Sequence, residues 1–259
     1  QLQWFEHKPL FGKKIAITRA PHQSLKLGEI LTEKGADVLY CPTIDIKPIK
    51  PNKKLSGAIE NISKYSFIIF TSTNAVSLFF ETLFGMGKDT RALAGIKAMP
   101  IGDATASLLV SKGINPDYMP ETFTSEGIVE TLKTIDIQGK SFLLPRAEEA
   151  RDIIVTFIRN HGGTCDVVPI YRATLPKDVT PLNETQDITT FTSSSTVKNY
   201  VTLYGRETLK NTIIASIGPV TTRTLSDFGF TTQIEAKRYD IPGLVDAIEE
   251  YIKSRGRGS

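Results

Sequence analysis

The sequence has few of the side chains that bind metals or form disulfide bonds. Its 259 residues include two cysteines and three histidines. Cys41 and Cys165 lie in apolar, strand-like runs and form no Cys-x-x-Cys pair, and the histidines belong to no ligand motif. We therefore expect two buried free thiols, a reducing cytosol and no metal site.

Long apolar runs and a strong excess of charge are also absent. No segment approaches the roughly 20 apolar residues that span a bilayer, and the N-terminus has no signal-peptide core. The net charge of +3 comes without a clustered basic stripe. This composition argues against a membrane protein and a nucleic-acid-binding protein, and it suits a protein that attracts a small polyanion.

Common nucleotide-binding and catalytic motifs are missing as well. The sequence contains neither Gly-x-Gly-x-x-Gly nor the phosphate-binding Gly-x-x-x-x-Gly-Lys-Ser/Thr. It has no Ser–His–Asp constellation, no His-Glu-x-x-His and no Cys–His pair. These absences give no support to a hydrolase or a metalloenzyme.

What the chain does contain is an internal repeat, the sequence signature of a duplicated unit. Four segments of the first half return in the same order in the second half. The pairs are Gly12–Ala20 with Gly139–Ala147, Phe70–Val76 with Phe191–Val197, Ile101–Gly113 with Ile217–Gly229, and the segment near Thr124 with that near Tyr239. The kept order indicates a duplicated α/β unit with altered loop lengths.

Short β-rich runs alternate with helical patterns through both copies. The predicted strands are Lys14–Thr18, Asp37–Pro42, Phe67–Thr71, Lys97–Ile101, Ser141–Pro145, Cys165–Pro169, Ile188–Thr192 and Ile213–Ile217. The predicted helices are Ser24–Lys34, Asn74–Phe84, Ala104–Lys112, Ser125–Thr134, Ala150–His161, Thr196–Tyr204, Thr221–Phe228 and Gly243–Ser254. Several strands are almost continuously apolar, as expected of strands buried on both faces. We therefore predict an α/β fold with two doubly wound parallel-sheet domains.

Two proline-bearing stretches, Pro42–Pro51 and Pro169–Pro181, have the character of inter-domain connections. If the chain crosses at both, its middle forms one domain and its two ends combine into the other. We expect an inserted domain over 50–169, a discontinuous domain over 1–45 and 174–259, and connections near 43–51 and 169–181.

Five loops with small polar side chains follow predicted strands and lead into helices. They are Thr18–Arg19, Thr71–Asn74, Gly102–Thr105, Thr192–Thr196 and Gly218–Thr222. Ligands of open parallel sheets bind beyond the carboxyl ends of the strands, and helix N-termini attract anions. Residues of these types are also ordinary helix N-caps, so each loop alone has a purely structural explanation. Their occurrence in matched pairs favours anion binding.

Three larger side chains stand out at predicted strand ends or at a predicted domain connection. Arg19 and Arg146 are repeat-related cations at strand ends. We predict that they bind ligand, and the alternative is that each pairs with a neighbouring acid. Tyr171 lies at a predicted connection, where a tyrosine is either an interface residue or a functional one.

Seven short motifs follow one another along Leu10 to Tyr251. They are ITRA from Ile17, TSTNAV from Thr71, IGDATA from Ile101, PIYRA from Pro169, TFTSSSTV from Thr190, IGPVTTRTL from Ile217 and YDIPGLVDAI from Tyr239. In this order and spacing, the chain resembles the uroporphyrinogen-III synthases. The resemblance implies two α/β domains joined by a two-stranded antiparallel connection, an active site in the cleft between them, and no cofactor.

The resemblance also implies residue roles. Tyr171 and Thr221 correspond to functional residues of the family, Thr105 is the repeat-related threonine of the other domain, and the serine-rich loop falls on 193–195. We therefore predict Tyr171 and Thr221 as catalytic. The predicted substrate-binding residues are Arg19, Thr71, Ser72, Asn74, Thr105, Arg146, Ser193, Ser194, Ser195 and Thr222.

The implied reaction is the cyclisation of hydroxymethylbilane to uroporphyrinogen III, with loss of water and inversion of ring D. The substrate's eight carboxylates can bind amides, hydroxyls and arginines. Because hydroxymethylbilane also closes unaided to the non-inverted isomer, the enzyme's task is chiefly to hold both ends in one reactive arrangement. Tyr171, protonated at neutral pH, can donate a proton to the departing hydroxide.

Two other functions fit the same residues. The first is a non-catalytic two-domain protein that binds a small anion or a tetrapyrrole through the same five loops. The second is a module that only scaffolds neighbouring biosynthetic enzymes. Tyr171 and Thr221 favour the enzyme, because a pure scaffold has no need of them.

The opening of the sequence carries two large apolar residues, Trp4 and Phe5, before the first predicted strand. This arm either packs on its own domain or arrives from an upstream domain. The second interpretation resembles the junction in proteins that join a uroporphyrinogen-III methyltransferase to this synthase. We predict such an S-adenosylmethionine-dependent domain before residue 1, where it would meet released product at a raised local concentration.

Overall fold

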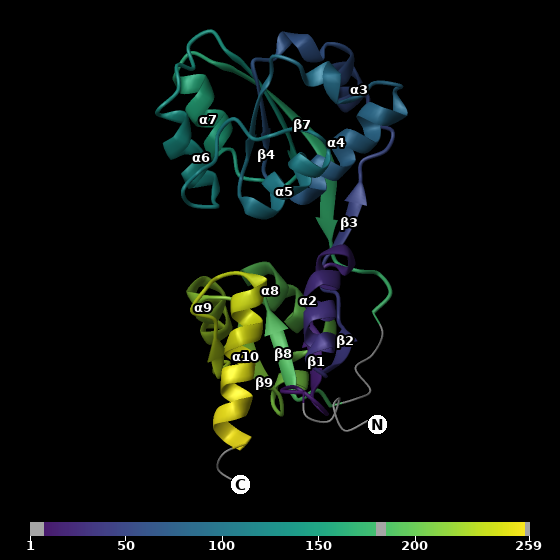
Figure 1. Cartoon of the computed structure of the whole chain (residues 1–259), viewed down its shortest axis with the longest axis vertical. Coiled ribbons are helices and arrows are strands. Elements are labelled where there is room, and N and C mark those ends of the chain that lie inside the picture. Colours follow the sequence, from purple (N-terminus) through teal and green to yellow (C-terminus); the bar gives the residue numbers. More distant parts are fainter. Residues whose placement is uncertain (1–7, 180–184, 257–259) are drawn as a thin grey trace. The chain divides into compact units, whose positions relative to one another are not determined.

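The protein is described from a computed structural model, which covers residues 8–179 and 185–256 (Figure 1). The chain forms two compact units. Unit 1 contains Gln1–Asp45 and Thr174–Ser259, and unit 2 contains Ile46–Ala173. The arm with Trp4 and Phe5 lies outside the described residues.

Unit 2 is a five-stranded sheet with helices on both faces. The strands lie in the order β3-β7-β6-β4-β5, and the pairs β6–β7, β4–β6 and β4–β5 are parallel. Their bounds are β3 (Asp45–Pro48), β4 (Phe67–Phe70), β5 (Lys97–Pro100), β6 (Ser141–Ala147) and β7 (Thr164–Thr174). The helices are α3 (Lys53–Glu60), α4 (Thr73–Gly85), α5 (Asp103–Ser111), α6 (Ser125–Leu132) and α7 (Ile153–Asn160), with the 3-10 helices η1 (Ile62–Lys64) and η2 (Thr90–Leu93).

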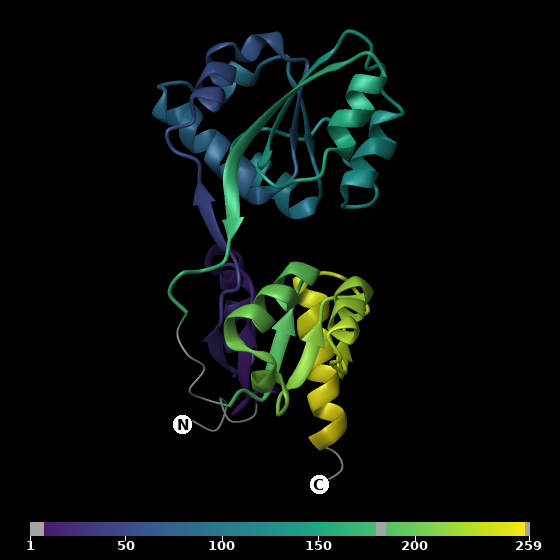
Figure 2. The ribbon, with the colours of Figure 1, turned by 180° about the vertical axis from the view of Figure 1, so that it is seen from behind.

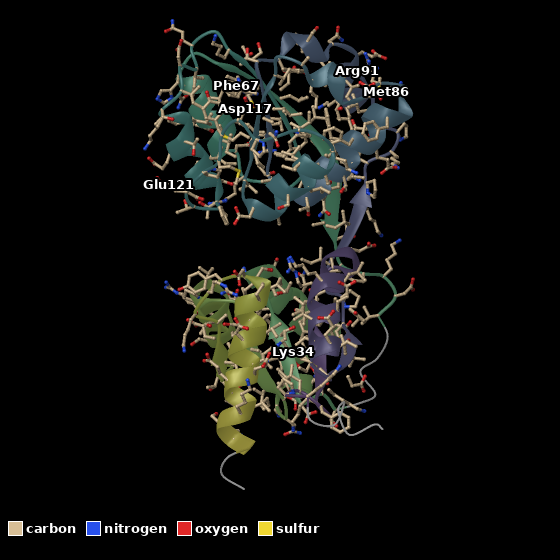
Figure 3. The ribbon with its side chains drawn as sticks, in the orientation of Figure 1. Lys34, Phe67, Met86, Arg91, Asp117 and Glu121 are labelled. Carbon is tan, nitrogen blue, oxygen red and sulfur yellow. The ribbon has the colours of Figure 1, made fainter. Side chains whose placement is uncertain are left out.

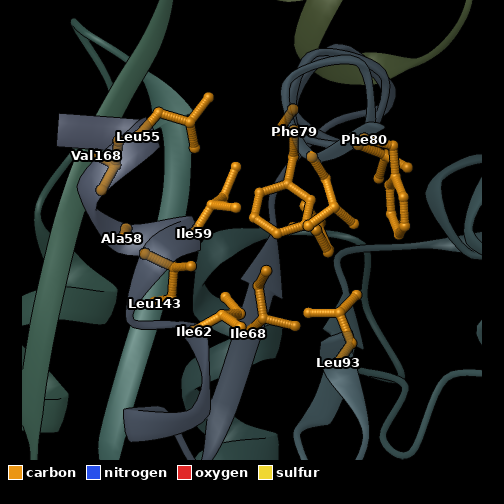
Figure 4. Close-up of a cluster of buried hydrophobic side chains, with 14 of the residues drawn as sticks. Leu55, Ala58, Ile59, Ile62, Ile68, Phe79, Phe80, Leu93, Leu143 and Val168 are labelled. Carbon is orange, nitrogen blue, oxygen red and sulfur yellow. The ribbon is translucent and has the colours of Figure 1, made fainter. Parts of the chain in front are cut away.

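Strand β4 shows how the sequence Phe-Ile-Ile-Phe builds two cores at once. Successive side chains of a strand point to opposite faces, so a continuously apolar strand requires cover on both. Phe67 and Ile69 pack with residues of α6 and α7 on one face. Ile68 and Phe70 pack with residues of α3, α4 and α5 on the other, where Figure 4 shows Ile68 beneath Phe79.

Unit 1 has the same layered build. Its strand order is β10-β9-β8-β1-β2, and all of these neighbours are parallel. The strands are β1 (Lys14–Ile17), β2 (Asp37–Tyr40), β8 (Ile188–Phe191), β9 (Ile213–Ser216) and β10 (Ile234–Glu235). Helices α2 (Pro21–Glu33) and α10 (Ile241–Gly256) cover one face, and α8 (Ser194–Tyr204) with α9 (Pro219–Asp227) covers the other, next to η3 (Arg206–Leu209).

The internal repeat of the sequence is a repeat of structure. The order β9-β8-β1-β2 in unit 1 corresponds to β5-β4-β6-β7 in unit 2, as the matched sequence segments require. In both units the strands are added in an order that needs parallel crossover connections, with helices on the two faces. The predicted α/β fold with two doubly wound sheets is confirmed.

The chain passes from one unit to the other at Asp45 and again at Ala173. Strand β3 and the long strand β7 carry these two passages, and they run in opposite directions in both views (Figures 1 and 2). The backbone N–H of Ile49 donates to the carbonyl of Ile170 at 3.0 Å just beyond β3. A two-stranded connection is therefore part of the fold.

All eight predicted strands and all eight predicted helices are present, with ends shifted by a few residues. The residue pattern did not predict two strands and one α-helix of the described residues. Strand β3 lies in the connection near 43–51, where the family resemblance alone implied a strand, α3 follows it, and β10 is a two-residue strand at the edge of unit 1. Strand β7 also continues to Thr174, beyond its predicted end at Pro169.

Candidate active site

The carboxyl end of the sheet in unit 2 brings Ser72 and Tyr171 into contact. Ser72 follows β4 and caps α4, because its Oγ accepts a hydrogen bond from the N–H of Ala75 at 3.1 Å. The same Oγ lies 3.0 Å from Tyr171 Oη. Tyr171 lies on β7 just past a register shift opposite Arg146 and Ala147. This irregularity sets where the phenol meets the loop after β4.

The phenol of Tyr171 is buried and held in its protonated form. Burial raises its pKa above the usual value, and the negative charge of Glu149 acts in the same direction. Hydrogen bonds to Ser72 and Asn74 act in the opposite direction without cancelling the effect of burial. A protonated hydroxyl in a fixed position can serve as a general acid.

Two further predicted residues of unit 2 lie at the same edge of the sheet. Thr71 comes directly after β4 and is half-buried. Thr105 lies in the first turn of α5, after Gly102, and its side chain is buried. The loops that follow the neighbouring parallel strands β4 and β5 therefore lie at the same carboxyl end of the sheet as Tyr171.

Arg146 does not present a free cation at this edge. Its Nη1 donates to the carbonyl of Arg151 at 2.9 Å, and its Nη2 forms an ion pair with Asp152 at the start of α7. The side chain is buried. The structure therefore bears out the alternative that this arginine pairs with a neighbouring acid, and its guanidinium fixes the loop between β6 and α7.

Unit 1 carries a serine-rich counterpart of the loop after β4. Ser193 caps α8 in a reciprocal capping box with Thr196. Ser195 Oγ lies 3.0 Å from Ser193 Oγ, and Ser194 Oγ lies 2.7 Å from Thr224 Oγ1. Ser193 therefore serves as a helix cap, while Ser195 of the same loop remains exposed.

The loop after β9 and the start of α9 carry the other predicted hydroxyl side chains of unit 1. Thr221 lies in the first turn of α9 and is buried. Thr222 Oγ1 lies 2.6 Å from the Oγ of Ser216, the last residue of β9. The structure thus brings Ser194, Thr221 and Thr222 to the ends of the neighbouring strands β8 and β9.

Arg19 is the exception among these polar groups. It lies two residues after β1, and burial lowers its pKa. Its Nε is buried without a hydrogen-bond partner, as is that of Arg146, but unlike Arg146 its guanidinium forms no ion pair with a carboxylate of the described part of the chain. A partly buried cation without an anion is costly, so an incoming carboxylate would be strongly favoured at this position.

Two further hydroxyls lie beside these residues: Thr18 belongs to the first of the predicted loops, and Thr43 was not singled out by the sequence. Thr18 Oγ1 donates to the carbonyl of Thr190, and Thr43 Oγ1 donates to that of Thr18, both at 2.8 Å. They tie β1, β8 and the loop after β2 together below Arg19. Thr224 was also missed, although it lies one turn after Thr221 on the same helix.

The structure also has a cavity that lies away from the predicted site residues. A cavity of about 480 Å³ between β10 and α10 is lined by charged side chains such as Lys237, Asp246 and Glu250. None of the predicted site residues lines it. Over residues 8–179 and 185–256, no group of three or more His, Cys, Asp or Glu side chains is placed to hold a metal ion. No helix of this part is long and apolar enough to cross a membrane.

Cys41 and Cys165 are both free and buried, as predicted. Burial raises the pKa of the Cys41 thiol to about 12 and that of Cys165 to about 11. Both thiols are therefore protonated and unreactive at neutral pH.

A family model described as uroporphyrinogen-III synthase HemD matches residues 26–246. The chain is 30% identical to a porphyrin biosynthesis protein HemD of Ruminiclostridium josui, over 96% of this chain and 51% of that protein. It thus spans about half the length of that relative. It is also 30% identical to a uroporphyrinogen-III synthase of Synechococcus elongatus, over 95% of this chain and 98% of that one.

A solved structure has a similar fold. A mutant uroporphyrinogen III synthase from the extremely thermophilic bacterium Thermus thermophilus matches with a TM-score of 0.66, over 94% of this chain and 100% of that one. The sequence identity to it is 14%, so this likeness concerns the fold alone.

Proposed function

This chain belongs to the uroporphyrinogen-III synthase family, and we propose that it closes hydroxymethylbilane into uroporphyrinogen III. The observation that carries the proposal is the cluster of Ser72, Asn74 and Tyr171 at the carboxyl end of the sheet of unit 2. It holds a protonated phenol in one position beside a helix N-terminus, and no part of the cluster requires a metal or a cofactor.

Tyr171 acts as the general acid of the first step. Its hydroxyl donates a proton to the hydroxide that leaves the terminal carbon on ring A, so that water, a phenolate and an azafulvenium cation form. The substituted carbon of ring D then attacks this carbon and gives a spiro intermediate. Fragmentation and recombination invert ring D, and ring closure releases a proton that returns to the phenolate. Water is the sole by-product, so the atoms balance without a co-reactant.

The polar loops of both units bind the carboxylates of the substrate. In unit 1, Arg19 supplies a cation that no carboxylate of the described residues pairs with, and the hydroxyls of Ser193, Ser194, Ser195 and Thr222 lie at the strand ends of the same unit. In unit 2, the polar side chains that we propose as ligands at the strand ends are those of Thr71, Ser72, Asn74 and Thr105. Backbone N–H groups in the first turns of α4, α5, α8 and α9 add donors with a favourable dipole.

We also assign Thr221 a catalytic role. The reasons are the family resemblance and the position of Thr221 in the first turn of α9. Arg146 is the weakest of the proposed ligands, because its guanidinium already pairs with Asp152. An extra ligand role for it would require that pair to open.

The decisive experiment follows the product isomer. Hydroxymethylbilane is generated in situ, the protein is added, the product is oxidised, and isomers I and III are separated by chromatography. The proposal expects isomer III in excess over the protein-free control. Isomer I alone would contradict it and would leave the non-catalytic tetrapyrrole-binding protein as the better explanation.

Two further expectations go with the proposed function. A cytoplasmic setting is supported by the two free, buried thiols. The upstream methyltransferase domain stays a prediction, and the synthase of Synechococcus elongatus has almost the same length as the present chain. Reading the genomic frame before residue 1 tests it.

A further inference from the structure

Two aromatic side chains are exposed at equivalent places in the two units. Phe123 and Tyr239 keep 54% and 65% of their surface in contact with solvent. Each ring lies against the backbone of a glycine that begins a helix. A Cβ added to Gly102 would lie 2.7 Å from Phe123 Cγ, and one added to Gly218 would lie 2.8 Å from Tyr239 Cδ1. One face of each ring therefore covers a main chain that any side chain would displace.

The turns that carry the two rings are built alike. The residue after each ring caps the next helix, because the N–H of Gly127 donates to Thr124 Oγ1 at 3.0 Å and that of Gly243 donates to Asp240 Oδ1 at 2.7 Å.

The residue before each ring is equivalent too. A Cβ on Gly127 would lie 1.9 Å from the carbonyl oxygen of Thr122, and one on Gly243 would lie 2.2 Å from that of Arg238. Both copies of the duplicated unit thus keep the same tight turn and hold an aromatic ring in its middle.

The location of the rings links them to the proposed site. Gly102 follows β5 and Gly218 follows β9, so both rings lie at the carboxyl ends of their sheets. Three residues beyond these glycines come Thr105 and Thr221. On the approach to Phe123 the loop is exposed, and Glu121 lies at the outside of unit 2 (Figure 3).

We propose that Phe123 and Tyr239 are substrate-contact residues, each of which packs its open ring face on a pyrrole ring of the tetrapyrrole. This inference rests on the proposed function and adds the apolar part of recognition to it. Aromatic rings pack face to face with an offset, or edge to face, and a pyrrole is a flat, electron-rich partner.

The substrate needs such contacts because its carboxylates surround apolar rings. Each pyrrole carries two acidic arms, which can reach the N–H groups at the start of α5 or α9 while the ring lies on the neighbouring aromatic. If the rings served only to cover glycine, a leucine, which is smaller but still bulky and apolar, would replace them without effect on the substrate. The substitution to leucine therefore separates the two explanations.

The experiment measures the KM for hydroxymethylbilane in Phe123→Leu and Tyr239→Leu. We expect KM to rise about tenfold in each variant, equivalent to about 1.4 kcal/mol of lost binding. Tyr239→Phe keeps the ring and is expected to retain the wild-type KM. Phe84→Leu is the matched control, because Phe84 is 45% exposed at the far end of α4, away from the carboxyl edge. Its KM is expected to be unchanged.

A second measurement separates this inference from the proposed function. Equilibrium binding of uroporphyrin III is followed by quenching of the porphyrin fluorescence in wild type and in the same variants. If the wild type makes only isomer I, yet both leucine variants lose affinity for uroporphyrin III, the synthase proposal fails and the aromatic contacts stand. Wild-type KM and wild-type porphyrin affinity in both leucine variants would overturn the inference, as would a wild type that neither reacts nor binds.

Discussion

Among the described residues, unit 2 pairs the arginine and the phenol at the carboxyl end of its sheet with neighbouring groups, whereas the repeat-related arginine of unit 1 has no ion-pair partner. In unit 2 Ser72 contacts the buried phenol of Tyr171. The repeat-related Ser193 of unit 1 instead contacts groups of its own loop, namely the hydroxyl of Ser195 and the backbone N–H and hydroxyl of Thr196. The same scaffold thus carries a group that can donate a proton in one copy and groups suited to binding anions in the other.

The repeat-related arginines show this difference directly. Arg146 is tied to Asp152 and to a backbone carbonyl, but Arg19 has neither kind of partner within residues 8–179 and 185–256. Duplication preserved the strand order and the turns, because these fix the core, while the side chains at the strand ends diverged. Identical folds in one chain therefore do not imply identical roles at the loops, where function resides.

The largest expected effect concerns the two units as folding domains. We propose that Ile46–Ala173 unfolds cooperatively when expressed alone, because it holds a complete sheet and both of its helical layers. A fragment of similar length, Gln1–Ile135, should show no sharp transition. It lacks β6, which lies between β4 and β7, and it separates β1 from its neighbour β8. Circular dichroism during heating measures both, and a sharper transition in Gln1–Ile135 would disprove the proposal.

Next in size is the effect of the hydroxyl of Tyr171. Tyr171→Phe should lower kcat by about 10²-fold, in the range typical of a lost general acid, while the fold is kept. Tyr200→Phe is the matched control in unit 1. Its hydroxyl is also buried and accepts a hydrogen bond from Gln186 Nε2 at 3.2 Å, but no predicted site residue contacts it. Initial rates of isomer III formation test the pair, and an equal loss in both variants would show that the effect is structural.

Most of the fold could be predicted because the strands of both sheets are buried on two faces. Apolar runs such as β4 and β8 stand out in the sequence, and polar loops mark their ends. Strand β3, with Asp45, Lys47 and Pro48, has no such pattern. It forms because β7 offers it an edge, which is a tertiary effect that local sequence does not contain. The two residues of β10 are too few to form a pattern at all.

The site was predictable in its residues more than in its contacts. The loops after the strands were found from their small polar residues. Ser72 and Tyr171, however, lie 99 positions apart in the sequence, and they meet only because the strand order places β4 and β7 on the two sides of β6. Asp152, the partner of Arg146, lies six residues further along the chain and could have been suspected from local charge. That no described residue pairs with Arg19 in this way depends on the whole surroundings of β1.

The smallest effects come from neutralising the two arginines, and they sharpen the contrast between the units. Arg19→Met should raise the KM for hydroxymethylbilane about tenfold, because a charge-assisted hydrogen bond to a carboxylate is lost. It should leave the thermal midpoint unchanged or higher, since the buried part of this cation gains no pairing from the described residues. Arg146→Met should do the opposite. Its pair with Asp152 is screened, because that carboxylate is 69% exposed, so we expect a loss of about 1 kcal/mol in the free energy of unfolding and an unchanged KM.

Kinetics and thermal melts of the two variants together test whether the two arginines have different roles. If Arg146→Met raises KM as much as Arg19→Met does, the pair with Asp152 opens for substrate and the two units bind it alike. If Arg19→Met changes only stability, the unpaired guanidinium is a structural residue and the anion-binding role of unit 1 rests on its hydroxyls and backbone N–H groups alone.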